Sequence, residues 1–283
     1  MKHTHILYNP LAGNGSCRQK AEQLALRYQN AKLRDLTRIK DYAAFFEQIN
    51  ETDSVILCGG DGTLCRFANE TEGITIPGKL YYSPAGTGND FANDIGQKET
   101  DEPIEISGYL QNLPTVAVCG TTTRFLNGVG YGIDGYCCDE GDRMRESGEQ
   151  KINYAMIAVK GLLFHYVPTS ATVTVDGKEH TYQNVWLAPT MHGRYYGGGM
   201  MPTPDQKRNS DDRTLSLMVM HSASKLKTLA VFPSIFKGEH VKHTDMVHVL
   251  QGKEITVRFD RPTPLQIDGE TVLGVTEYTA RIA

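Results

Sequence analysis

Short apolar runs and amphipathic stretches alternate through the first part of the chain. Two of the amphipathic stretches, 16–29 and 42–49, carry apolar residues at the spacing of one helix face, and a further helix is expected from Leu64. The apolar runs have the length of buried strands and cover 5–8, 32–36, 54–58 and 80–83. Strands that alternate with helices predict a parallel sheet with helices on both faces.

The pattern changes after Pro114 to a series of strands. Asp176-Gly177 separates two of them and is a strong signal for a hairpin turn. The predicted strands cover 116–119, 121–127, 171–175, 180–188, 215–221, 247–250, 254–259 and 277–282, with helices at 151–166 and 225–236. We expect an α/β domain over residues 1–120 and a mainly antiparallel β-sandwich domain over residues 121–283. A return of the last strand, 277–282, to the first domain is the alternative.

The predicted helix at 151–166 carries a continuous apolar stripe. An amphipathic helix of this kind usually packs its stripe into a core, so we expect core packing rather than membrane contact. The stripe consists of Ile152, Ala155, Met156, Val159, Leu162 and Leu163.

Composition and charge exclude several classes of protein. Apolar residues make up 40% of the 283 residues, charged residues make up 22%, and the formal net charge is −4. This balance provides no basic surface for nucleic acid, and no apolar run is long enough to span a bilayer. The chain enters a strand directly, without a signal-peptide pattern, so we expect a cytoplasmic protein. The histidines and cysteines show no triad or metal-ligand spacing, and reduced cysteines are expected.

The stretch Cys58-Gly59-Gly60-Asp61-Gly62-Thr63 lies between a predicted strand and a predicted helix. Such a junction leaves backbone N–H groups that bind phosphate oxygens well, and glycines allow close approach. Asp61 could orient a magnesium ion, and Thr63 adds a hydroxyl donor. A tight turn without a ligand is the alternative.

Two more loops of this kind follow predicted strands. One reads Asn9-Pro10-Leu11-Ala12-Gly13, and the other reads Pro84-Ala85-Gly86-Thr87-Gly88-Asn89-Asp90-Phe91-Ala92. The carboxyl ends of parallel strands meet at one edge of the sheet, where α/β proteins bind their ligands. Three loops at one edge favour a phosphate site over three unrelated turns.

The motifs N-P-x-A-G, G-G-D-G-T and P-x-G-T-G-N-D-F-A, in this order, resemble the catalytic domain of the diacylglycerol kinase family. NAD kinases and phosphofructokinases share G-G-D-G-T and the expected sheet, but they lack the third motif. The resemblance implies binding of ATP with Mg²⁺. One departure is that Cys65 and Arg66 replace the N-E that many members carry. The predicted ATP-site residues are Asn9, Pro10, Leu11, Ala12, Gly13, Thr37, Gly59, Gly60, Asp61, Gly62, Thr63, Arg66, Gly86, Thr87, Gly88, Asn89 and Asp90.

The stretch Gln266-Ile267-Asp268-Gly269-Glu270 is similar to the family's Q-x-D-G-E element, and 127–135 is similar to its N-x-x-x-x-G-x-D element. The resemblance implies that Asp268 is the general base that takes the proton of the acceptor hydroxyl, with Asp61 and Glu270 as further catalytic residues. Glu270 either orients Asp268 or serves the metal. A plain hairpin turn at Asp268-Gly269 is the alternative.

Bacterial members carry G-G-G-M followed by D-G-x-L, where a structural magnesium binds. The corresponding residues here imply a metal site formed by the Asp212 side chain and the carbonyls of Asn209 and Thr214. Arg213 replaces the expected glycine, so a solvated loop without metal remains open. His192, Tyr195 and Tyr196 precede the glycines; they could border the acceptor pocket, but we expect them at the surface.

These observations predict an ATP-dependent lipid kinase with its active site in a cleft between the two domains. It would transfer the γ-phosphate of Mg-ATP to the hydroxyl of a lipid such as diacylglycerol, and it would reach that lipid peripherally at the inner face of the membrane. A kinase for a soluble nucleotide, as in NAD kinases, and a non-catalytic nucleotide-binding regulator are the alternatives. A homodimer through an edge strand is left open.

Overall fold

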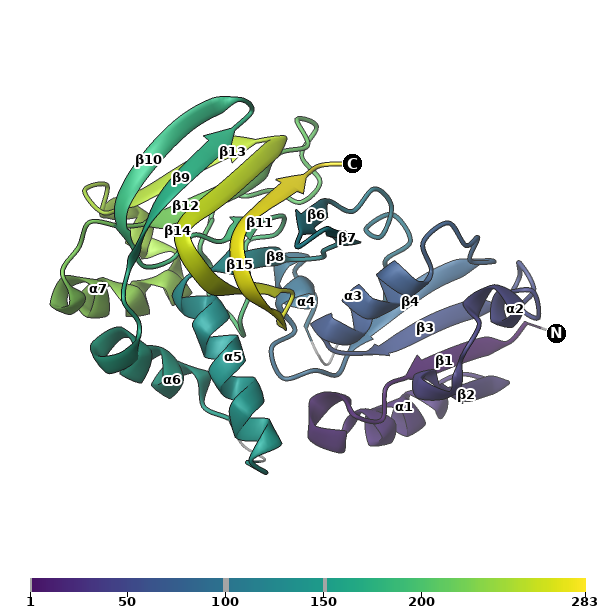
Figure 1. The fold of residues 1–283 in the computed structure, drawn as a ribbon. Coiled ribbons are helices and arrows are strands. Elements are labelled where there is room, and N and C mark those ends of the chain that lie inside the picture. Colours follow the sequence, from purple (N-terminus) through teal and green to yellow (C-terminus); the bar gives the residue numbers. More distant parts are fainter. Residues whose placement is uncertain (1, 99–101, 150–151) are drawn as a thin grey trace. The chain divides into compact units, whose positions relative to one another are not determined.

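The computed structural model describes residues 2–98, 102–149 and 152–283. The chain divides into two compact units, Met1–Leu113 and Pro114–Ala283 (Figure 1). The division precedes the predicted boundary at 120/121 because the strand Thr115–Val118 pairs within the sheet of the second unit.

The first unit contains a sheet with the strand order β2-β1-β3-β4-β5. The strands are β1 (Thr4–Tyr8), β2 (Ala31–Asp35), β3 (Ser54–Gly59), β4 (Lys79–Pro84) and β5 (Ile104–Glu105). Strands β1 to β4 pair in parallel, whereas the short β5 pairs with β4 in the antiparallel direction. The predicted parallel sheet is therefore confirmed.

Helices cover both faces of this sheet, because its central strands are apolar on both sides. The helices are η1 (Ala12–Gly15), α1 (Cys17–Ala25), η2 (Leu36–Arg38), α2 (Tyr42–Phe46), α3 (Asp61–Glu70) and α4 (Asp90–Asp94). Helix α1 packs against Ile6 and Ile56 on one face. Phe67 of α3 packs edge-on against Tyr42 and Phe46 of α2. Helices α1 and α2 end before the predicted residues 29 and 49.

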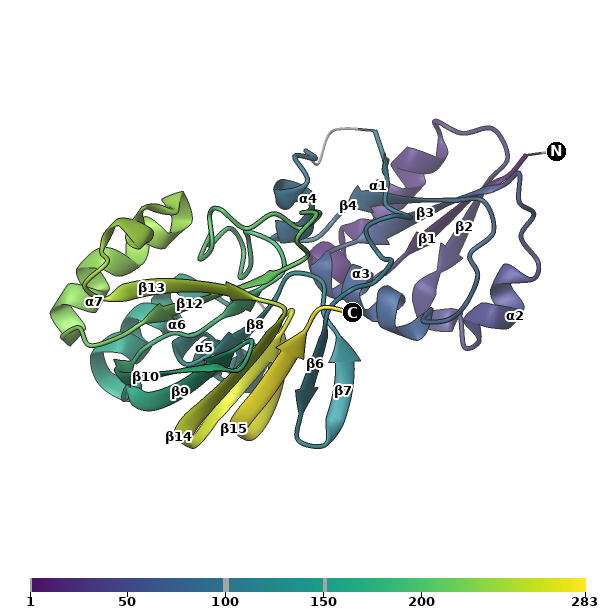
Figure 2. The ribbon, with the colours of Figure 1, turned by 90° about the horizontal axis from the view of Figure 1, so that it is seen from above.

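The second unit contains a larger sheet with the order β13-β12-β11-β8-β14-β15-β6-β7, to which β9 and β10 are joined through β14 (Figure 2). Its strands are β6 (Thr115–Val118), β7 (Thr121–Arg124), β8 (Gly128–Tyr131), β9 (Thr169–Val175), β10 (Lys178–Val185), β11 (Thr190–Met191), β12 (Leu215–Met220), β13 (Val247–Gly252), β14 (Glu254–Ile267) and β15 (Glu270–Arg281). The strand pairs of this sheet are antiparallel, which confirms the predicted class. The last strand, β15, stays within this sheet between β14 and β6.

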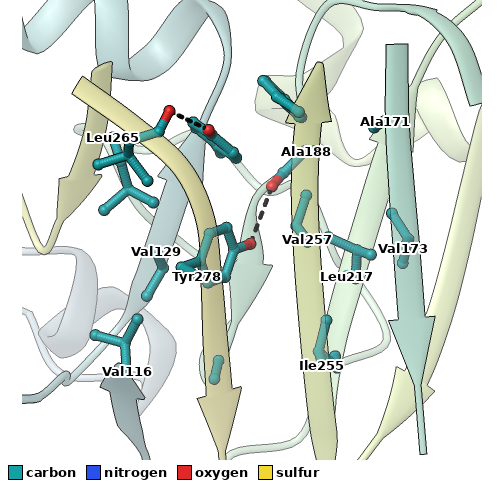
Figure 3. Close-up of a cluster of buried hydrophobic side chains, with 14 of the residues drawn as sticks. Val116, Val129, Ala171, Val173, Ala188, Leu217, Ile255, Val257, Leu265 and Tyr278 are labelled. Atoms are coloured by element: carbon teal, nitrogen blue, oxygen red, sulfur yellow. Dashed lines mark hydrogen bonds between the residues drawn. The ribbon is translucent and has the colours of Figure 1, made fainter. Parts of the chain in front are cut away.

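The strongly curved sheet encloses a core of aliphatic and aromatic side chains. Figure 3 shows Val173, Leu217 and Val257 among the side chains of this cluster. Beside them the rings of Tyr131 and Phe259 stack with their centroids 3.8 Å apart. This packing fixes β8 against β14, and these two strands carry the Q-x-D-G-E turn and the start of the 127–135 motif.

A second core lies between this sheet and the helices of the unit. The helices are α5 (Ile133–Glu146), α6 (Tyr154–Lys160), the π-helix η3 (Gly161–His165), α7 (Lys225–Val231), η4 (Phe232–Lys237) and η5 (Glu239–Lys242). They bury residues such as Ile133, Leu162 and Ile235 together with Trp186. The sequence pattern did not predict α5, because most of its residues after Cys138 are charged. Among the described residues, no helix combines the length and the hydropathy that a membrane span requires.

Candidate active site

The three predicted phosphate loops lie together at one edge of the first sheet. In the parallel register Tyr8 is opposite Cys58, and Gly59 is opposite Pro84, so the loops after β1, β3 and β4 start at the same level. The Asn9 side chain donates a hydrogen bond to the Thr63 hydroxyl at 3.0 Å. The structure therefore brings the predicted loops together at one edge of the sheet.

Several loop glycines are required by the close approach of the loops to one another. A Cβ atom on Gly86 would lie 2.6 Å from the Cα of Gly60, and one on Gly13 would lie 2.4 Å from the carbonyl oxygen of Ala85. Contacts this short force the backbone to move. These glycines are thus explained by packing, without a ligand.

Gly62 is different, because a Cβ atom there would meet nothing within 4 Å. Gly62 lies in the first turn of α3, where glycine costs about 1 kcal/mol relative to alanine. The N-cap residue of α3 is Gly60, which provides no side-chain cap for the first N–H groups. The helix therefore begins with an uncapped, uncovered turn at the loop edge.

The Asp61 side chain connects two of the loops. Its Oδ2 accepts a hydrogen bond from the Asp90 N–H at 2.9 Å, and its Oδ1 accepts one from the Phe91 N–H at 2.8 Å. The carboxylate thus binds the start of α4, while Asn89 closes the preceding turn through bonds with the backbone of Gly86. Asp61 holds the second and third loops together.

The remaining predicted nucleotide residues differ in their exposure. Leu11, Thr87 and Arg66 are exposed, whereas Asp90 is buried. Thr37 follows β2 at the same edge of the sheet, and its hydroxyl donates to the Asp35 carboxylate at 2.7 Å.

In the second unit, Asp268 and Gly269 form the turn between β14 and β15. Both have positive φ angles, +47° and +95°, as the tightest hairpin turns require. The Asp268 carboxylate accepts hydrogen bonds from the N–H groups of Leu126, Asn127 (2.8 Å) and Gly128 (3.0 Å). The side chain therefore ties the turn to the start of β8.

Glu270 follows this turn as the first residue of β15 and is exposed. It pairs with Ile267 across the hairpin, so its position is set by the same turn that Asp268 stabilises. In the Q-x-D-G-E turn, Asp268 therefore accepts hydrogen bonds from backbone N–H groups, whereas Glu270 lies at the surface.

Sequence reasoning missed Arg208 at this site. Its guanidinium group donates to the carbonyl of Leu126 and, at 2.8 Å, to the Asn127 side chain. His192, which also contacts the Leu126 carbonyl, lies beside it. Arg208 and Asp268 thus bind the same segment, residues 126–128. Arg208 donates to its carbonyl and side-chain oxygens, and Asp268 accepts from its N–H groups. The sequence offered only a basic residue near the G-G-G-M loop.

Two residues expected at the surface are buried. His192 is held by the Leu126 carbonyl, and Tyr196 lies beside Asp134 at the start of α5. Burial raises the pKa of the Asp134 carboxyl from its ordinary value to about 7, against the smaller opposite effects of the Gly135 N–H and Tyr196. Asp134, from the N-x-x-x-x-G-x-D element, is therefore a buried acid that titrates near neutral pH.

The predicted metal loop lies between β11 and β12. Among the described residues no group of three or more histidine, cysteine, aspartate or glutamate side chains could hold a metal ion. Asp212 is exposed, and the Thr214 carbonyl already accepts a hydrogen bond from Gln206 at 2.8 Å. Arg213 adopts φ = +45°, the conformation that favours the glycine of D-G-x-L, and it donates to the Ala283 carbonyl at 2.7 Å. The loop therefore has the expected backbone at position 213, and the magnesium site formed by Asn209, Asp212 and Thr214 stays a prediction.

Comparisons with known proteins cover both units. Residues 3–120 match the diacylglycerol kinase catalytic domain, and residues 127–282 match the YegS C-terminal NAD kinase beta sandwich-like domain. A diacylglycerol kinase of Mycobacterium tuberculosis (strain H37Rv) is 29% identical over 266 residues, which are 89% of this chain and 83% of that protein. A diacylglycerol kinase of Bacillus subtilis is 24% identical over 283 residues, 95% of this chain and 90% of the relative.

A solved structure shows the same fold. The crystal structure of a diacylglycerol kinase from Bacillus anthracis has a TM-score of 0.62 at 18% identity, and the match covers 99% of this chain and 94% of that one.

Proposed function

Because the chain belongs to the diacylglycerol kinase family, we propose that it transfers the γ-phosphate of Mg-ATP to the hydroxyl group of a lipid such as diacylglycerol. Family membership supports kinase activity. The nucleotide, the magnesium ion that accompanies it and the lipid acceptor are our proposals. They rest on the chemistry of the two sites.

The uncovered first turn of α3 is the observation that supports nucleotide binding most strongly. Packing explains Gly13, Gly60 and Gly86, but nothing in the fold requires glycine at position 62. A phosphate group on the N–H groups of this turn provides the reason, because a side chain there would keep its oxygens away. The helix dipole also favours negative charge at this end.

Asp61 acts in this proposal as the residue that sets the shape of the phosphate loops. Both of its oxygens already accept hydrogen bonds from the N-terminus of α4. The magnesium ion arrives with ATP as part of the substrate. Removal of the Asp61 carboxylate would separate the second loop from the third and weaken the use of Mg-ATP.

We assign the proton acceptor to Glu270 and give Asp268 a positioning role. A general base needs an oxygen that can reach the acceptor hydroxyl, and the Asp268 oxygens are engaged by three backbone N–H groups. Glu270 is exposed and lies two residues further on, in a place that the Asp268 turn fixes. Phosphoryl transfer needs placement and one such carboxylate more than covalent help.

Transfer of labelled γ-phosphate from ATP to diacylglycerol in mixed micelles, with magnesium, tests the proposal. A parallel reaction contains NAD as the acceptor. Label in the lipid product supports the proposal. Label only in the NAD product would transfer the assignment to a soluble acceptor, and ATP binding without transfer to any acceptor would favour a regulator.

A further inference from the structure

The segment formed by α6 and η3 exposes apolar side chains on one side and buries them on the other. Ile157, Ala158 and Leu162 are buried in the second core. Met156, Val159 and Phe164, on the opposite side, are 54%, 43% and 72% exposed. The stripe predicted to pack into a core is therefore divided, and two of its members, Met156 and Val159, are exposed to solvent.

The N-terminus of α7 extends this apolar surface. Helix α7 lies against η3, and the Lys225 ammonium group donates a hydrogen bond to the Leu163 carbonyl at 3.3 Å. The neighbouring Leu226 is 77% exposed, and Val167, just after η3, is 56% exposed. We call Met156, Val159, Phe164, Val167 and Leu226 the apolar patch.

Basic groups surround the apolar patch. Lys160 belongs to the exposed side of α6, Lys225 lies beside Leu226, and Arg261 donates to the Val167 carbonyl. One acidic group near α7, Asp245, pairs with Lys227.

Asp260 also lies near the patch, and its carboxylate accepts bonds from Thr169 and Ser170. The negative charge of Asp260 offsets the charge of Arg261, so Lys160 and Lys225 provide the net positive charge of the patch, in a chain whose formal net charge is −4.

We infer that the apolar patch and its lysines form the surface with which this protein docks onto an anionic lipid bilayer. The inference rests on the proposed lipid acceptor, because a kinase for such an acceptor must work at an interface. Exposed aliphatic and aromatic side chains that project from helix ends next to lysines are the pattern of interfacial binding. The apolar groups enter the acyl boundary, and the cations meet anionic headgroups.

Apolar and basic substitutions test the two parts of this surface separately. Loss of two large apolar side chains should weaken vesicle binding by at least about tenfold, given the usual gain from their burial. Each lysine near an anionic surface contributes about fivefold, and this contribution falls with salt. Loss of the apolar side chains should weaken binding to every vesicle, whereas loss of the lysines should weaken binding to anionic vesicles only.

The experiment measures co-flotation of the full chain with phosphatidylcholine vesicles, with and without phosphatidylglycerol, in the absence of ATP and diacylglycerol. The variants are the doubles F164S/L226S and K160Q/K225Q. Matched controls are Leu26→Ser, whose side chain is 88% exposed in the first unit, and Lys178→Gln on an exposed hairpin. We expect F164S/L226S to lose at least about tenfold in binding. K160Q/K225Q should lose the preference for anionic vesicles, and both controls should bind like the parent.

Equal binding by the parent and both double variants would overturn the inference, as would a parent that floats with neither vesicle. Sedimentation of the parent as a dimer that F164S/L226S dissociates would assign the patch to a second copy and also overturn it. Turnover on a short-chain diacylglycerol that is monomeric in solution separates this test from that of the function. If the parent does not turn over this substrate, the proposed kinase activity is refuted. If the parent turns it over but does not bind vesicles, only the docking surface is refuted.

Discussion

Asp268 and Asp176 occupy equivalent positions in two hairpin turns, and their carboxylates perform the same structural task. Each has φ = +47° and precedes a glycine with positive φ. Asp268 accepts hydrogen bonds from three consecutive N–H groups at 126–128, and Asp176 accepts them from Lys253 (2.9 Å) and Glu254 (2.8 Å). Asp176 lies in a turn that no motif associates with catalysis. The comparison therefore shows that such a turn aspartate can serve the backbone alone.

Asp268→Asn should reduce the free energy of unfolding by about 1–3 kcal/mol, because its amide NH₂ replaces the Oδ2 that accepts the Leu126 N–H. Asp176→Asn should reduce it by less, because both backbone N–H groups there bond to Oδ1, which asparagine retains. Urea unfolding of both variants measures the loss. If Asp268→Asn unfolds like the parent but loses turnover, Asp268 rather than Glu270 would be the proton acceptor.

Gly86→Ala and Gly62→Ala form a matched pair at the nucleotide loops. The new Cβ at position 86 would lie 2.6 Å from the Cα of Gly60, so this variant should lose about 1–3 kcal/mol of stability. The Cβ at position 62 meets open space, and alanine in the first turn should add up to about 1 kcal/mol.

ATP affinity should nevertheless fall in Gly62→Ala, because the methyl group covers the N–H groups of α3. Thermal unfolding and calorimetric titration with ATP measure the two effects. Unchanged ATP affinity in Gly62→Ala would remove the main support for the nucleotide site.

Asp134 should make stability depend on pH between about 4 and 7. Its folded-state pKa of about 7 lies above the ordinary value of 3.8, so the folded chain retains a proton that the unfolded chain releases. The resulting stability is fully present below the unfolded pKa. It is lost as pH rises to about 7, at about 1.4 kcal/mol for each unit between the two values.

Asp134→Asn should flatten this part of the profile. Urea unfolding at a series of pH values compares the variant with the parent. Parallel profiles for the two proteins would mean that Asp134 is ionised in the folded state.

Arg213→Gly should raise the free energy of unfolding by about 1 kcal/mol. Arg213 adopts a left-handed conformation that costs a non-glycine residue about 1–2 kcal/mol. Its exposed bond to the Ala283 carbonyl offsets only part of this cost. Thermal unfolding of the variant measures the gain, and Arg38→Gly, an exposed arginine at negative φ, should be destabilising instead.

The sequence contained enough information to predict the fold class and the loop cluster. Apolar runs of strand length at β1, β3 and β4 are each followed by a loop that contains glycine, and this pattern predicts both the sheet and the edge where its loops meet. Helix α5 was missed because its stability comes from tertiary packing of a few residues such as Ile133 and Cys137, which no strong apolar period announces.

The roles that we propose for the acidic residues could not be predicted from spacing. Motifs identify Asp61, Asp268 and Glu270, but only the structure shows that Asp61 and Asp268 accept bonds from backbone N–H groups and that Glu270 is exposed. Arg208 was missed for a similar reason, because its partner Asn127 is distant in sequence. The apolar patch depends on which side of α6 is buried, and periodicity alone does not provide that information.

The measurement that tests the account most directly is phosphate transfer from Mg-ATP to diacylglycerol by Glu270→Gln. The substitution keeps the size of the side chain and removes its ability to take a proton. We expect the turnover number to fall by at least about a hundredfold, with unchanged ATP affinity and stability. Glu179→Gln, at an exposed position of β10, should match the parent. Turnover of Glu270→Gln within a few-fold of the parent would contradict the assignment of Glu270 as the proton acceptor.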